Sequence, residues 1–324
     1  MQQPLPKKWT RRVLAIRIGA TLLGGAVLIV LFALLAMLYW MNAKAPILMP
    51  GKMIAPDASA WVRLDFAAAP TRTVPAEVIP AATQGMPEQA AKLVQKGLHD
   101  PSCHVRIVFS RTSAGEKAMA VNLGKYPGMF RLVRRDLERR SEKRLLPYAI
   151  KYHSGAPMFF TEGMESSSLT PIAIKDTVIV QAANTSELER FLDVINDPRE
   201  EQRAYIGSCQ FDAQSWLLLT QLAGDVGPMW KETAERMGKE LPVLNRLEGI
   251  YCFSGAALGG RLELVAASLE DAAEAAREVP DWIRKNPQIG STTLAVVSVT
   301  TREKEVMINF SAPGAPAPAI PVPY

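Results

Sequence analysis

The chain is poor in the residues that cross-link small extracellular domains. Its 324 residues include only three cysteines, whereas a disulfide-stapled scaffold needs a larger and even number. One disulfide could form in an oxidising compartment, and Cys209 with Cys252 is then the expected pair, because both fall in the same expected module. Free cysteines are among the most often buried residue types, so we favour the alternative of three buried thiols.

Catalytic motifs are absent from the sequence as well. It contains no GxxxxGK[ST] or GxGxxG phosphate loop, no HExxH, no CxxC and no GxSxG. Only three histidines are available as general bases or metal ligands. We therefore predict no catalytic residues, no metal and no cofactor, and we lean towards a non-enzymatic role.

Three groups of residues are weak candidates for chemistry, and each has a structural explanation. His99, Cys103 and His104 are close in sequence, but a closed zinc site needs a fourth ligand, which is missing nearby. His153 would need an acid and a nucleophile from distant segments. The remaining candidates lie in a Gly/Ser-rich stretch that is typical of a solvated loop: Glu162, Glu165 and Ser166 to Ser168.

Acidic residues are missing from the first 45 positions, which carry six basic ones. The whole chain has 37 basic and 32 acidic side chains, but without this segment the counts are 31 and 32, a net charge of −1. A nucleic-acid-binding protein needs a clustered positive footprint. The sequence therefore predicts no nucleic-acid partner, and its basicity is a feature of the N-terminus.

The longest apolar run extends over residues 18–41 and contains no charged residue. As a helix it would be roughly 36 Å long at 1.5 Å per residue, which exceeds the hydrocarbon core of about 30 Å. We predict a transmembrane anchor here, with the lipid bilayer as its partner. The expected anchor residues include Ile18, Gly24 and Leu31, with Tyr39 and Trp40 at the headgroup level.

The flanking charges predict the orientation of the anchor. Residues 1–17 contain five basic side chains, and excess Lys and Arg stays on the cytoplasmic side. We therefore expect a single-pass protein of the cell inner membrane with a cytoplasmic N-terminus and a periplasmic body. A signal peptide cut after Ala45 is the alternative, but the apolar run is longer than a signal core of 7–15 residues.

The order of expected elements predicts an α+β fold with antiparallel sheets, divided into segments. The basic tail (1–17) and the anchor (18–41) precede a Pro-rich spacer (42–59) that lifts the body off the membrane. Two modules follow (60–198 and 199–310), each in the βαββαβ order of a ferredoxin-like unit and repeating at an offset of about 144 residues. A Pro-rich disordered tail (311–324) ends the chain.

Apolar alternation and turn residues give the expected elements of the body. Two capping boxes, Ser186 with Glu189 and Ser268 with Asp271, are expected to open helices. Hairpin turns are expected at 113–116, 175–176 and 259–260. Strands are expected at 61–66, 105–109, 117–121, 149–153, 158–160, 171–174, 177–181, 205–211, 250–253, 261–266, 292–299 and 305–310, and helices at 87–97, 127–144, 186–195 and 268–285, with a long helical region between 211 and 247.

The helix expected at 127–144 carries the strongest charge feature outside the N-terminus. Its arginines could bind anionic headgroups or an acidic wall polymer. Asp136, Glu138 and Glu142 interleave with them, and such mixing is typical of a solvated face with salt bridges. The residues of this candidate interaction surface are Arg131, Arg134, Arg135, Arg139 and Arg140.

Taken together, these features predict a membrane-anchored extracytoplasmic protein that serves as a scaffold or accessory subunit of a cell-envelope assembly. Its partners would be the bilayer and an envelope protein or a second copy of the chain. Two alternatives remain open. One is a tethered hydrolase with a dispersed site centred on His153 or His104, and the other is a ligand-binding sensor.

Overall fold

The computed structural model describes residues 27–70, 72, 74–75, 78–112, 115–161, 170–197, 215–223, 242–254, 257–285, 288–289, 292–293 and 295–313. These residues form a mixed α+β structure whose strand pairings are all antiparallel. The predicted fold class is confirmed at that level.

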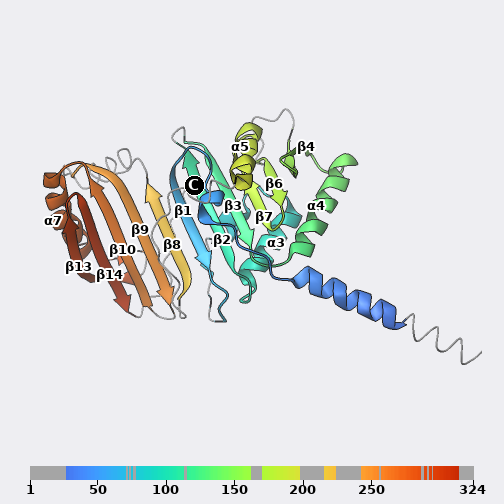
Figure 1. Cartoon of the computed structure of the whole chain (residues 1–324), viewed down its shortest axis with the longest axis horizontal. Coiled ribbons are helices and arrows are strands. Elements are labelled where there is room, and N and C mark those ends of the chain that lie inside the picture. Colours follow the sequence, from blue (N-terminus) through green and yellow to red (C-terminus); the bar gives the residue numbers. More distant parts are fainter. Residues whose placement is uncertain are drawn as a thin grey trace, which may run out of the picture.

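One twelve-stranded sheet runs through the body, in the order β13-β14-β10-β9-β8-β1-β2-β3-β7-β6-β5-β4 (Figure 1). A separate two-stranded hairpin pairs β11 (Gln288–Ile289) with β12 (Thr292–Thr293). The strands of the large sheet are β1 (Ala58–Phe66), β2 (Val105–Thr112), β3 (Lys117–Leu123), β4 (Ala149–His153), β5 (Ala156–Phe160), β6 (Ile172–Lys175), β7 (Val178–Gln181), β8 (Ser215–Ala223), β9 (Leu244–Ser254), β10 (Ala257–Ala266), β13 (Ala295–Arg302) and β14 (Glu305–Pro313).

Helices cover both faces of this sheet. The first face packs against α2 (Val78–Thr83), α3 (Glu88–His99), α4 (Pro127–Glu142) and α7 (Leu269–Lys285). The second face packs against η1 (Pro50–Met53) and α5 (Thr185–Asn196). A further helix over residues 27–42 precedes η1 and leaves the body at the end where α4 lies (Figure 1).

The two hydrophobic cores follow from the period of two along each strand. In β2, Ile107 and Phe109 belong to the core of the first face, whereas Val108 between them belongs to the core of the second. Strands buried on both faces have nearly continuous apolar sequences, as β7 shows with four buried residues in a row.

The expectation of two ferredoxin-like sheets is wrong. A split βαβ unit inserts its third strand between the first and second, but here β2 lies between β1 and β3. The two halves are instead joined by the antiparallel pairing of β1 with β8. On either side of this pair the sheet has the same arrangement. Three strands follow in chain order (β1-β2-β3 or β8-β9-β10), and a helix (α4 or α7) comes next in the chain. Later strands then return, so that β7 pairs with β3 and β14 pairs with β10.

Three local expectations in the second half also need correction. The long helical region contains the strand β8, whose apolar run Leu217 to Leu219 has no polar alternation to distinguish a central strand from a buried helix. Gly259 and Gly260 lie inside β10 and not in a turn. β14 continues to Pro313, so the first three residues of the expected tail pair with β10.

The predicted capping box is present at the start of α7, whereas α5 begins at a different cap. Ser268 accepts a hydrogen bond from the Asp271 amide at 3.0 Å and donates to its carboxylate at 2.6 Å, as the capping box at α7 predicts. At α5 the cap is Asn184, whose side chain accepts from the Glu187 amide at 2.9 Å. The helix therefore begins before Ser186, because Asn is as good an N-cap as Ser.

Candidate functional site

The helix over residues 27–42 is apolar on all sides, and above its last turn the described residues leave its side chains exposed. The exposed fraction is 71% for Ile29, 70% for Phe32 and 80% for Tyr39. Leu31 is 49% exposed and Trp40 38%. Within the described residues, no helix meets the length and hydropathy of a membrane span, and Ile18 and Gly24 lie outside the described residues.

The last turn of this N-terminal helix packs against the first turn of α4. A Cβ atom added at Gly128 would lie 2.7 Å from Cε3 of Trp40 and 3.0 Å from Cα of Met41. The guanidinium of Arg131 lies over the Trp40 ring, 5.5 Å from its centroid. Such a cation–π contact favours a fixed ring position, so the helix is attached to the body at its base.

Residues 43–55, which we call the strap, follow the N-terminal helix and lie against the sheet. The Ala45 amide donates to the Gly124 carbonyl at 2.9 Å, and the Ala43 carbonyl accepts from the Tyr126 amide at 3.0 Å. Further along, the Ala55 amide donates to Oγ of Ser110 at 3.2 Å. The expected spacer over 42–59 is thus not a free linker: it is bound to the body, and β1 begins within it.

Buried polar side chains of the sheet hold the strap at its centre. Asn122 is fully buried, accepts from the Leu48 amide at 2.6 Å and donates to the Thr177 carbonyl at 3.1 Å. Arg106 donates to the Leu48 carbonyl at 2.5 Å and to the buried carboxylate of Asp65. Because a buried polar group left unpaired is costly, these contacts fix the path of the strap.

The residues just before α4 form a second polar cluster at the base of the N-terminal helix. Tyr126 has a left-handed backbone (φ 71°) and donates its hydroxyl hydrogen to Asp100, which also accepts from Lys125 at 2.8 Å. Burial alone would raise the pKa of Asp100, but hydrogen bonds from Lys125, Tyr126 and Ser102 hold that pKa well below its usual range. Burial, with the bond to Asp100, raises the pKa of Tyr126.

The structure places the predicted arginines along α4, which was predicted at its correct start. Arg131, Arg135 and Arg139 are exposed. Arg134 lies 3.5 Å from the Glu138 carboxylate, and Arg140 lies 3.6 Å from that of Asp136. Both expected features are therefore present: salt bridges between neighbouring turns of the helix, and exposed arginines.

The histidine candidates do not form a hydrolytic site among the described residues. The Asp193 carboxylate accepts from Ser154 at 2.8 Å and contacts the His153 ring at 2.7 Å. Since the carboxylate lies between the hydroxyl and the imidazole, His153 is not placed to deprotonate Ser154. Burial lowers the pKa of His104, which lies 3.9 Å from Asp65.

The residues considered as metal ligands or disulfide partners form no metal site or disulfide within the described residues. No group of three or more His, Cys, Asp or Glu side chains in the described part of the chain could hold a metal ion. Cys103 is a buried free thiol, and burial raises its pKa to about 11, so it is unreactive near neutral pH. The segments with Glu162, Glu165 and Cys209 lie outside the described residues, as does the side chain of Cys252.

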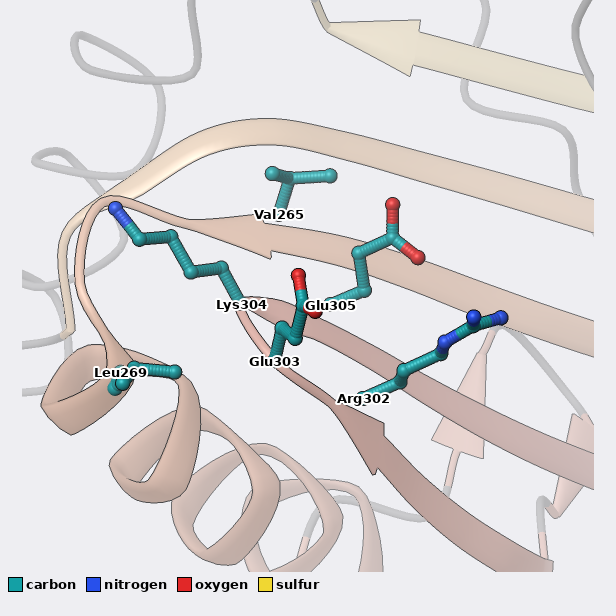
Figure 2. A pocket seen from close by; sticks show the side chains of 6 residues that line it. All are labelled: Val265, Leu269, Arg302, Glu303, Lys304 and Glu305. Carbon is teal, nitrogen blue, oxygen red and sulfur yellow. The ribbon is translucent and has the colours of Figure 1, made fainter.

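A hollow of about 640 Å³ lies between the β13–β14 turn and the start of α7. Figure 2 shows the side chains of Arg302, Glu303, Lys304 and Glu305 around it, together with the apolar side chains of Val265 and Leu269. The Lys304 ammonium is engaged by the Ala267 carbonyl at 2.7 Å. Cations and anions alternate around this hollow, so it has no uniform charge for a small ionic ligand.

The sequence carries little sign of the residues that attach the N-terminal helix and the strap. Gly128, Asn122 and Tyr126 each have ordinary local explanations in the sequence, as a helix-start glycine, a strand residue and an aromatic. Their roles depend on contacts with segments far away in the chain, such as the 74 residues that separate Leu48 from Asn122. A glycine directly after Pro127 was the one available signal of close approach.

No protein-family profile matches the chain, and no curated protein matches it. Among solved structures, crystal form IV of TP0453 is similar with 13% sequence identity and a TM-score of 0.43, covering 84% of this chain and 94% of that chain. Crystal form III of TP0453 gives 13% identity and a TM-score of 0.44, with 84% and 96% covered.

Proposed function

We propose that the protein is a single-pass membrane-anchored extracytoplasmic protein whose α+β body acts as a non-enzymatic scaffold or accessory subunit of a cell-envelope assembly. The observation that carries the anchor is the uncovered apolar helix over residues 27–42. A helix that is hydrophobic on all sides is stable only in a protein core or in lipid. The body leaves this helix uncovered, which favours lipid.

The apolar sequence continues N-terminally from this helix. Residues 18–26 add nine uncharged residues, so that the run of 24 is long enough to cross a bilayer. Five basic residues precede it, which favours a cytoplasmic N-terminus. The body then lies in the periplasm, and the strap holds it close to the membrane surface.

The scaffold role is supported by the ion pairs and hydrogen bonds between segments of the body. The ionisable clusters described above link secondary-structure elements: Asp65 with Arg106, and Asp100 with Lys125 and Tyr126. Each of these contacts joins two segments of the body, which is typical of structural networks. The partner class that fits is a second envelope protein or another copy of the chain.

The anchor is tested by membrane fractionation of the full chain expressed in a bacterial host. We expect the protein to resist extraction at alkaline pH and to float with the membranes. The double variant Leu31→Arg, Leu35→Arg places two charges in the apolar helix, each costing about 2.5–3.5 kcal/mol in a bilayer, and should move into the soluble or aggregated fraction.

A matched control for this variant is Leu145→Arg, Leu269→Arg, which changes two exposed leucines of the body (65% and 64% exposed). It should fractionate like the original chain. Recovery of the unmodified protein in the soluble fraction would contradict the anchor. For the scaffold role, the detergent-solubilised chain is crosslinked and its mass measured; a monomer with no associated protein would count against that role.

A further inference from the structure

Three arginines form a row along the exposed face of α4. Arg131, Arg135 and Arg139 are four residues apart and all exposed, so they lie one above another on the same face of the helix. At 1.5 Å per residue the row is about 12 Å long. The opposite face is anchored in the core by Phe130 and Leu137, which fixes the direction of the row.

Positive charge is concentrated in this segment. Residues 127–144 contain seven basic and three acidic residues, a net charge of +4, whereas the chain from residue 46 onwards has a net charge of −1. The two ion pairs of α4 engage Arg134 and Arg140. No ion pair of Arg131, Arg135 or Arg139 is found among the described residues, so the row is available to an external anion.

The row begins at the base of the N-terminal helix. Its first member, Arg131, lies over the ring of Trp40, and Figure 1 shows α4 running crosswise to the N-terminal helix at the end of the body from which that helix leaves. Trp at the end of a membrane helix lies at the headgroup level. A helix that crosses the anchor at this point runs along the membrane surface.

We propose that the exposed face of α4 binds the phosphate groups of anionic phospholipids in the bilayer that holds the N-terminal helix; this rests on the proposed function. Guanidinium groups bind phosphate oxygens through paired hydrogen bonds, and each basic residue near an anionic bilayer adds to its attraction. Leu132, 43% exposed beside the row, can enter the headgroup layer. The contact holds the body at a fixed tilt on the membrane.

The test is photo-crosslinking of the full chain in lipid nanodiscs. p-Benzoylphenylalanine replaces Leu132, and in a second protein it replaces Leu269, an exposed leucine of α7 at the other end of the sheet. Nanodiscs contain either phosphatidylcholine alone or phosphatidylcholine with 30% phosphatidylglycerol (about a third anionic lipid). Lipid adducts are quantified by mass spectrometry.

We expect at least a five-fold higher adduct yield at position 132 with the anionic lipid, lost in high salt, and background yield at position 269. Arg131→Gln, Arg135→Gln, Arg139→Gln should remove the increase, since each arginine contributes about five-fold. The matched control is Arg277→Gln, Arg284→Gln, which changes two exposed arginines of α7 and should keep the increase.

Equal yields in both lipids, or no loss in the triple variant, would overturn the inference. Crosslinks from position 132 to protein or polymer in place of lipid would also overturn it. Failure of the proposed function is distinguishable, because the chain would then be absent from purified nanodiscs altogether. Thermal unfolding in detergent checks that each variant is folded.

Discussion

Gly128 and Trp40 are in direct contact, although they are 88 positions apart in the sequence. The contact is possible because Gly128 has no side chain, which leaves room for the indole ring. A Cβ atom there would lie 2.7 Å from Trp40 Cε3. The contact connects the exposed N-terminal helix to α4 and therefore determines how the body is oriented relative to that helix.

Gly128→Ala should loosen this attachment. The new methyl group displaces Trp40, and overpacking of this kind costs about 1–3 kcal/mol, partly offset by a gain in helix propensity of about 0.5–1 kcal/mol. We expect faster proteolysis after Lys44 with little change in the unfolding of the sheet. Gly259→Ala is the matched control, because nothing lies within 4 Å of its added Cβ; equal proteolysis of both variants would refute the contact.

Asn122→Ala should release the strap. The change removes the acceptor of the Leu48 amide and the donor to Thr177, and leaves buried polar groups unpaired at about 1–3 kcal/mol each. The free energy of unfolding in urea should fall by that order, and trypsin should cleave faster after Lys52. Asn309→Ala removes only the bond to Ser298 at the surface and should leave both measurements nearly unchanged.

Glu187 gives the body a pH-dependent stability. Burial and the hydrogen bond with Glu116 raise the pKa of Glu187 to about 7, above the value of about 4.3 in an unfolded chain. The folded state therefore keeps a proton that the unfolded chain has lost, and stability falls as the pH rises from about 4.5 to 7. Above pH 7 the loss is constant.

Glu187→Gln removes this loss. The half-buried carboxyl is screened by solvent, so we expect a gain of about 1 kcal/mol, or roughly 2–4 °C in Tm, at pH 8 and almost none at pH 4.5. Glu116→Gln should give a smaller gain at pH 8, because it removes the neighbouring carboxyl but leaves the burial of Glu187 in place. A gain that is equal at both pH values would contradict a raised pKa of Glu187.

Local elements were predictable from the sequence where the pattern and the environment agree. The strand at Trp61 to Phe66, the pairing of β2 with β3 and the start of α4 at Pro127 all reappear in the structure. Each depends on neighbours in sequence: a period of two along a strand, a short connection, or a proline at the first helical position. The strand at Trp61 to Phe66 was expected to be half-buried, but every one of its residues is buried in the sheet. The capping box at Ser268 belongs to the same class.

The arrangement of these elements was not predictable in the same way. The pairing of β1 with β8 joins segments more than 150 residues apart, and the apolar run of β8 has no polar alternation that would mark it as a strand. The strap was expected to be a spacer because its prolines exclude regular structure. The strap is instead bound by Arg106 and Asn122. No local sequence pattern identifies Leu48 as their partner.

The central claim is that the helix over residues 27–42 lies in a bilayer with the body outside the cytoplasm. Limited trypsin digestion of spheroplasts that express the full chain with an N-terminal epitope tag tests it most directly. The account predicts loss of the body and a protected tagged fragment ending at Lys44 or Lys52. An intact chain in spheroplasts that trypsin degrades only after lysis would contradict it.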